Sequence, residues 1–157
     1  MNHSSQRHLS ALACLSIAIG LAAQVDASEP PSTVALEEMV AVLRTELGIN
    51  AVVSTAIVTG NSLLVSVQPV DGNRGAFRME FDERFLPSLD QDDLKAVIAH
   101  ELGHVWIYTH HPYLQTERLA NTVAMRAVPR ASLERAYGKV WAHQGTKGDL
   151  ARFLGPE

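Results

Sequence analysis

Two histidines and a glutamate within five residues are the clearest chemical signal in this chain. His100 and His104 are four residues apart, so on a helix both imidazoles project from one face and can bind one metal ion. Glu101 follows the first histidine and can lie beside a water molecule bound to that metal. The spacing therefore predicts a zinc ion that activates water, with Glu101 as the general base.

A catalytic zinc ion usually has three protein ligands and one open position, and Glu117 is the best candidate for the third. Glu117 and Asn121 lie one turn apart on the helix expected after the zinc-binding helix, so they face the same way. If the two helices pack antiparallel, Glu117 can bind the metal while the amide oxygen of Asn121 accepts the outer ring N–H of His100 or His104. A glutamate alone is more often a solvated helix charge, and the preceding motif favours the ligand role.

His110 is the alternative third ligand, because it occupies the last position of the metzincin pattern H-E-x-x-H-x-x-G-x-x-H. In that pattern the glycine permits a sharp turn back to the metal, and this chain has Ile107 there. A continuous helix would carry His110 away from the metal. We therefore expect His110 and His111 to end the helix, where a partly protonated imidazole interacts well with the helix dipole.

The elements before this site are expected to be one helix and three strands. Ser32 or Thr33 can cap a helix whose apolar residues recur at helical spacing as far as Leu47, and Gly48 ends it. The strands follow at residues 51–59, 63–70 and 76–81.

The pattern within these strands predicts a small antiparallel sheet. Gly60-Asn61 supplies a tight turn, so the first two strands are expected to form a hairpin. Residues 76–81 alternate apolar with charged side chains, as a half-buried third strand does.

The second half of the chain is expected to be helical, which gives an α+β fold class. A start signal at Ser88 or Asp90 predicts a zinc-binding helix over residues 91–108. Glu101 falls inside the apolar stripe of that helix, where an unpartnered carboxylate costs several kcal/mol and a metal-bound water would supply a partner. Further helices are expected at 113–128 and 132–141, before a weakly patterned tail from His143.

The N-terminal segment predicts export to the periplasm or the medium. An apolar run at residues 9–23 follows a basic start, and Val25-Asp26-Ala27 offers small residues for cleavage after Ala27. We therefore assign residues 1–27 to a signal peptide and 28–157 to a single domain. A retained membrane anchor is the alternative, although the run is shorter than the roughly 20 apolar residues of a spanning helix.

Composition limits the site and its partners. The single cysteine, Cys14, lies inside the predicted signal peptide, so zinc in the mature chain must be held by histidine and carboxylate. The formal net charge is −4 and no basic cluster is present, so we expect no nucleic-acid partner. We also expect no membrane contact after signal cleavage, and the sequence makes no prediction of oligomeric state.

The two motifs together resemble the gluzincin zinc metallopeptidases, in which H-E-x-x-H is followed on a second helix by E-x-x-A with aspartate or asparagine. Glu117, Ala120 and Asn121 match the second motif, and Asn121 stands where aspartate is commoner, which removes a charge beside the ligating histidine. The chain looks most like the minimal members, such as stand-alone domains of the M48 family and the ImmA/IrrE-like family. The resemblance covers residues from about 76 to 129 and implies a zincin-like fold, with a three-stranded sheet before the zinc helix.

The resemblance also implies an activity. The protein would hydrolyse peptide or protein substrates, with one catalytic zinc ion on His100, His104 and Glu117. An edge strand of such enzymes pairs with extended substrate, and residues 76–81 are the candidate here. A donor to the tetrahedral oxyanion is also implied, with Tyr113 as the first choice because it precedes the ligand helix by one turn. The alternatives are Tyr108, His110 and His111.

A catalytically silent, zinc-stabilised binding or regulatory module is the competing hypothesis. The intact Glu101 argues against it, since metal binding alone does not require that residue.

Overall fold

The structure, a computed structural model, describes residues 30–71 and 73–156. The predicted signal peptide, residues 1–27, lies outside this part of the chain. Within the described part, none of the helices combines the length and the apolar character needed to cross a bilayer.

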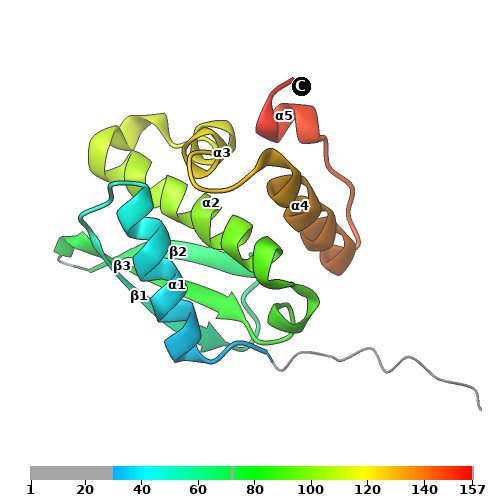
Figure 1. Cartoon of the computed structure of the whole chain (residues 1–157), viewed down its shortest axis with the longest axis horizontal. Helices are drawn as coiled ribbons and strands as arrows, with labels where there is room; N and C mark the ends of the chain where they lie inside the picture. Colours follow the sequence, from blue (N-terminus) through cyan, green and yellow to red (C-terminus); the bar gives the residue numbers. More distant parts are fainter. Residues whose placement is uncertain (1–29, 72, 157) are drawn as a thin grey trace, which may run out of the picture.

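The elements form an α+β fold with one three-stranded sheet, which confirms the predicted fold class (Figure 1). Two short 3-10 turns, η1 and η2, lie at Leu86–Ser88 and Pro112–Leu114. The strands are β1 (Val52–Val58), β2 (Val65–Val70) and β3 (Asn73–Asp82). The helices are α1 (Thr33–Glu46), α2 (Gln91–His110), α3 (Glu117–Ala124), α4 (Arg130–Gln144) and α5 (Leu150–Leu154).

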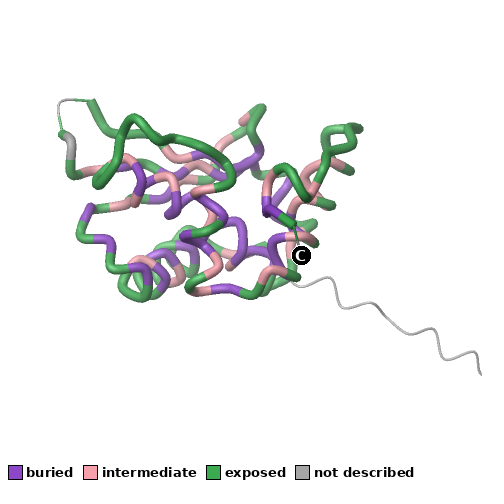
Figure 2. The backbone as a smooth tube through the Cα atoms, turned by 90° about the horizontal axis from the view of Figure 1, so that it is seen from above, coloured by how far each residue is buried: buried purple, intermediate pink, exposed green. Residues whose placement is uncertain are grey.

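Helices cover one face of the sheet and leave the other face toward solvent. On β3, Phe77, Met79 and Phe81 are buried, whereas Arg78 is exposed and pairs with Glu80 at 2.8 Å. The buried residues belong to one core cluster with apolar residues of α1 and α2. The alternation predicted for residues 76–81 is confirmed. Figure 2 shows buried and exposed residues interspersed along the backbone.

The predicted hairpin between the first two strands is wrong, and so is a fully antiparallel sheet. The strand order is β1-β3-β2, with β1 parallel and β2 antiparallel to β3. The Gly60-Asn61 pair belongs to a longer loop tied to the end of β3: the Asn61 N–H donates to Asp82 Oδ2 at 2.9 Å and its amide donates to the Glu80 carbonyl at 3.2 Å. The loop thus crosses the end of β3, which lies at the centre of the sheet.

The helix starts follow their capping residues. Ser32 Oγ accepts the Ala35 N–H at 3.2 Å, and Asp90 Oδ1 accepts the Asp93 N–H at 2.9 Å, as the sequence predicts for α1 and α2. The single helix predicted at 113–128 is wrong at its start, because Thr116 caps α3. Glu117 is therefore the first residue of its helix.

Other bounds also differ. The helix predicted at 132–141 is longer in the structure, where α4 spans Arg130–Gln144. The tail after His143, for which no element was predicted, contains α5. A five-residue helix is too short to show a helical period, so sequence periodicity does not detect it.

The two motif-bearing helices touch backbone to backbone. A Cβ atom built on Gly103 of α2 would lie 2.3 Å from the Ala120 carbonyl oxygen of α3 and 2.9 Å from its Cα. Ala120 is completely buried. Only glycine at position 103 permits this approach, and the approach places the start of α3 beside the histidines of α2.

We expect Gly103→Ala to destabilise the protein by about 1–3 kcal/mol, because the added methyl group meets backbone that cannot rotate away. Gly138→Ala is the matched control, since a Cβ on this exposed glycine of α4 meets nothing within 4 Å. It should stabilise by roughly 0.5–1 kcal/mol through helix propensity. Urea unfolding measures both, and equal effects of the two variants would contradict the close approach.

Candidate metal centre

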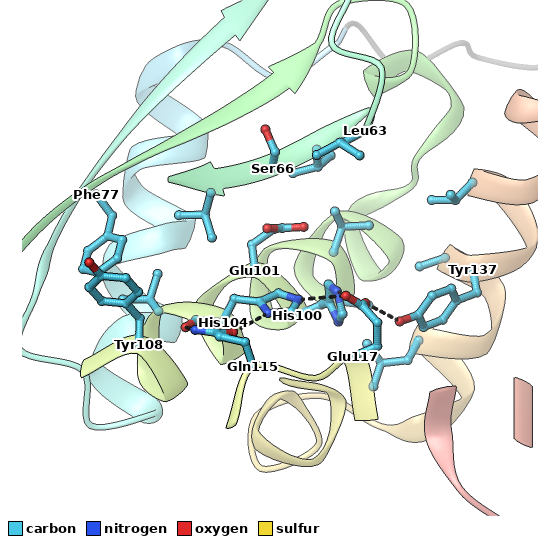
Figure 3. Close-up of a pocket in the computed structure, with 18 of the residues that line it drawn as sticks. Leu63, Ser66, Phe77, His100, Glu101, His104, Tyr108, Gln115, Glu117 and Tyr137 are labelled. Atoms are coloured by element: carbon cyan, nitrogen blue, oxygen red, sulfur yellow. Dashed lines mark hydrogen bonds and ion pairs between the residues drawn. The ribbon is translucent and has the colours of Figure 1, made fainter. Parts of the chain in front are cut away.

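Three side chains converge between α2 and α3 (Figure 3). His100 Nε2 lies 3.2 Å from Glu117 Oε2, and His104 Nε2 lies 3.4 Å from Glu117 Oε1. One donor atom from each of the three residues lies within 4.8 Å of the donor atoms of the other two. The structure therefore brings together all three residues that the sequence predicts as metal ligands.

The three donors are close enough to bind one zinc ion. Zinc bonds of about 2.0–2.1 Å in a tetrahedron place neighbouring ligand atoms roughly 3.3–3.4 Å apart. The two distances between imidazole nitrogen and carboxylate oxygen, 3.2 and 3.4 Å, are close to that value but run to different oxygens of Glu117, and all three donors lie within 4.8 Å of one another. Two imidazoles and one carboxylate are also a donor set that zinc accepts in hydrolytic sites.

Each imidazole is oriented by an amide on its outer nitrogen. Asn121 Oδ1 lies 2.8 Å from His100 Nδ1, the contact that the sequence predicts. Gln115 Oε1 lies 3.1 Å from His104 Nδ1, and the Gln115 amide donates to the His104 carbonyl at 3.2 Å. With Nδ1 donating to an amide oxygen, each ring presents the lone pair of Nε2 toward Glu117 and the metal position.

Gln115 was not anticipated from the sequence. It is exposed, precedes α3 and belongs to no recognisable spacing. Its position two residues before a predicted ligand is the one signal that could have singled it out.

The electrostatics of the three residues are strongly coupled. Where Nε2 of His100 and His104 carries a proton in place of a metal, it donates to Glu117, and these hydrogen bonds hold the pKa of Glu117 well below its ordinary value, so its carboxylate is ionised at neutral pH. Burial lowers the pKa of His104, but hydrogen bonds to Glu117 and Gln115 outweigh it, and the net shift is upward. A proton on His104 therefore competes with a metal ion, and metal binding weakens as pH falls.

Glu101 points into the same pocket from the buried side of α2 (Figure 3). It retains 9% of its exposure, and burial raises its pKa above the ordinary value. The imidazoles of His100 and His104 and the Val67 backbone N–H act in the opposite direction. A buried carboxylate whose pKa is shifted upward is suited to accept a proton near neutral pH.

The structure does not bring Tyr113 to the site. Tyr113 lies in η2, is 98% exposed, and is not among the residues that line the pocket. The 3-10 turn and the Thr116 cap separate it from α3, so the predicted one-turn spacing does not hold.

Tyr137 of α4 is the hydroxyl that lies beside the ligands. Its oxygen accepts the Asn121 amide at 2.9 Å and donates to Glu117 Oε2 at 3.5 Å. Burial raises the pKa of Tyr137 well above its ordinary value, so it keeps its proton and can donate. No motif marks Tyr137, because it reaches the site from a helix that follows the matched motifs.

The remaining alternatives have other surroundings. His110 is exposed and does not belong to the group of potential metal ligands, His100, His104 and Glu117. Its ring stacks on Trp106 with ring centroids 4.4 Å apart. His111 is exposed and caps α2, as predicted for the end of that helix. Tyr108 lines the pocket, where its ring meets Phe77 edge to face.

The metal position opens into a pocket of about 470 Å³ between β2, α2 and α4. Apart from the site itself, its walls are largely apolar. The strand beside it is β2, whose residues Val65, Ser66, Val67 and Pro69 line the pocket. The predicted edge strand, residues 76–81, is wrong for that role, because β3 is paired on both sides.

Comparisons with known proteins agree with this geometry. The sequence model of peptidase family M48 matches residues 20–145. The structure is similar to the crystal structure of the metallopeptidase zymogen abylysin from Pyrococcus abyssi, with a TM-score of 0.51 and 14% identity over 73% of this chain and 99% of that one. No curated protein matches the chain. The fold is thus one that a metallopeptidase uses, and the family match spans well over half of the sequence, so the chain belongs to peptidase family M48 and is a metallopeptidase.

Proposed function

We propose that the protein is a zinc-dependent peptidase that hydrolyses peptide bonds with Glu101 as its general base. The observation that carries the proposal is the convergence of His100, His104 and Glu117, whose donor atoms lie within 4.8 Å of one another, with the buried carboxylate of Glu101 beside them. One catalytic zinc ion is the proposed cofactor, and a peptide or protein is the proposed substrate.

Each residue of the site has a distinct role in the proposed hydrolysis. Zinc, when bound, lowers the pKa of water to about 7 and polarises a peptide carbonyl. Glu101 accepts a proton from the attacking water and delivers it to the leaving amine. Asn121 and Gln115 keep the two imidazoles in the tautomer that can bind a metal.

Glu101→Gln should retain zinc and lose about two to four orders of magnitude in kcat, because the amide cannot take the proton. Steady-state hydrolysis of an unstructured protein, with zinc content measured in parallel, provides the test. Glu46→Gln on the exposed end of α1 is the matched control and should behave as wild type. If the protein is a catalytically silent zinc module, the wild type and Glu101→Gln will both bind zinc and neither will hydrolyse protein. A fully active Glu101→Gln variant would exclude this residue from the mechanism.

Tyr137 is the proposed donor to the oxyanion that forms during attack, supported by its neutral hydroxyl beside Glu117. We expect Tyr137→Phe to lower kcat by about 10²–10³ with a smaller change in KM. Tyr113→Phe, which alters an exposed hydroxyl outside the pocket, should leave both constants unchanged. Kinetics in which Tyr113→Phe shows the larger loss would reverse the assignment.

The free edge of β2 is the proposed binding strand for an extended peptide. In the antiparallel pairing with β3, the Leu64 carbonyl accepts the Asp82 N–H at 2.7 Å, so the backbone groups of Val65 and Val67 face away from β3. Pro69 follows at the next outward position, where a missing N–H costs no ladder bond. The Val65 N–H already donates to the Leu63 carbonyl at 2.8 Å, so substrate pairing would centre on the Val65 carbonyl and on Val67.

Val67→Pro removes one outward N–H, and we expect KM for peptides to rise several-fold while the fold is preserved. Because this N–H also bonds Glu101, the pKa of Glu101 should rise further in the variant, which changes kcat and its pH profile but not KM. Val67→Ala keeps that N–H and removes only side-chain contacts, so it separates backbone pairing from packing. Unchanged KM in Val67→Pro, with circular dichroism as for wild type, would exclude β2 as the binding strand.

Export to the periplasm or the medium is proposed from residues 1–27 alone, whose pattern is that of a cleaved signal peptide. The intact mass of the protein recovered from its host should correspond to a chain that begins at Ser28. A mass that includes the apolar run would instead indicate a retained anchor.

A further inference from the structure

The amide of Asn121 is the centre of a buried network that extends beyond the metal site. Its side chain is completely buried. Oδ1 faces His100, while Nδ2 donates to the Tyr137 hydroxyl at 2.9 Å and to the Phe153 carbonyl at 3.0 Å. Phe153 belongs to α5, so the C-terminal helix touches the residue that orients a predicted metal ligand.

The Phe153 carbonyl decides which way this amide points. A backbone carbonyl can only accept, so the amide NH₂ must face Phe153 and the amide oxygen must face His100. His100 Nδ1 then has to donate, which leaves Nε2 free for a metal. The Tyr137 hydroxyl, which can both donate and accept, does not impose this choice by itself.

An aspartate at position 121 does not fit this arrangement. Aspartate is the commoner residue in the E-x-x-A motif, and its carboxylate could accept from His100. Its second oxygen, however, would face the Phe153 carbonyl at the distance where Asn121 now donates, 3.0 Å. Two buried acceptors without a shared proton repel each other, so asparagine and the docked α5 depend on each other.

Arg130 of α4 holds α5 in place. Its guanidinium donates to the carbonyls of Leu154 at 3.1 Å, Gly155 at 2.9 Å and Pro156 at 3.4 Å. Leu154 is buried, and the Phe153 ring packs near Tyr137 with centroids 5.3 Å apart. Figure 1 shows α5 beside α3 and α4, and α5 lies after the residues that the family model matches.

We propose that α5 is a positioning element of the metal site. Arg130 holds the carbonyls that follow Phe153, and the Phe153 carbonyl fixes the Asn121 amide and through it the ring of His100. Phe153 and Arg130 are positioning residues, since neither touches the metal position. The expected effect of α5 on metal binding rests on the proposed zinc site. The contact between Asn121 and α5 can be tested in protein without added metal.

The first test uses hydrogen exchange of the full chain without added metal. Asn121→Asp should accelerate amide exchange in residues 150–155 about tenfold, because the new carboxylate repels the Phe153 carbonyl. Arg130→Gln should accelerate the same amides, and the double variant should add little to the faster single one. Glu134→Gln breaks the 2.8 Å ion pair with Arg130 but leaves the contacts to α5, so it should exchange as wild type. Exchange at 150–155 that Asn121→Asp or Arg130→Gln leaves unchanged would overturn the proposal.

The second test uses the same variants with zinc added. Arg130→Gln should weaken zinc binding about tenfold and speed solvent exchange of the His100 Nδ1 proton, whereas Glu134→Gln should change neither. Wild-type zinc affinity and proton exchange in Arg130→Gln, with α5 released, would show that α5 is only a structural cap. If wild-type protein binds no zinc, the proposed function fails, and the first test still reports on the coupling between Asn121 and α5.

Discussion

The contact between Gly103 of α2 and Ala120 of α3 is the constraint on which the rest of the structure depends. A side chain at position 103 would overlap the backbone of α3, so the two helices lie as close as their main chains permit. This approach sets the distance between the imidazoles on α2 and the carboxylate at the start of α3. A separation greater by about one ångström would take the three donors outside the range of zinc bonds.

Fixed hydrogen bonds then orient the side chains that the helices bring together. Two amides determine the orientation of the two imidazoles, and each amide is itself fixed by a backbone carbonyl: His104 for Gln115 and Phe153 for Asn121. The network around Asn121 is buried, and a buried polar network is specific only when every member has a partner. The site thus depends on α3, α4 and α5 as well as on the helix that bears its first motif.

The sequence predicted correctly which side chains face one another where the residues lie one helical turn apart on the same helix. The four-residue spacing of His100 and His104, and of Glu117 and Asn121, predicted which side chains face one another, and the structure places them so. Gln115, Tyr137 and Phe153 reach the site from a loop and from later helices. Their contacts depend on tertiary packing that no local spacing encodes.

The sheet shows the same limit. Burial on β3 followed from its alternation, but strand order did not, because Gly60-Asn61 is compatible both with a hairpin and with a loop anchored by Asp82. Tyr113 was expected within a helix that in fact begins at Glu117, since the Thr116 cap lies inside a segment of continuous helical pattern.

The zinc dissociation constant of Glu117→Ala beside that of the wild type tests the central claim most directly. The account predicts one zinc ion per wild-type chain and a loss of more than about 100-fold in affinity when the carboxylate is removed. Equal affinity in the two proteins would show that α3 contributes no ligand and would contradict the account.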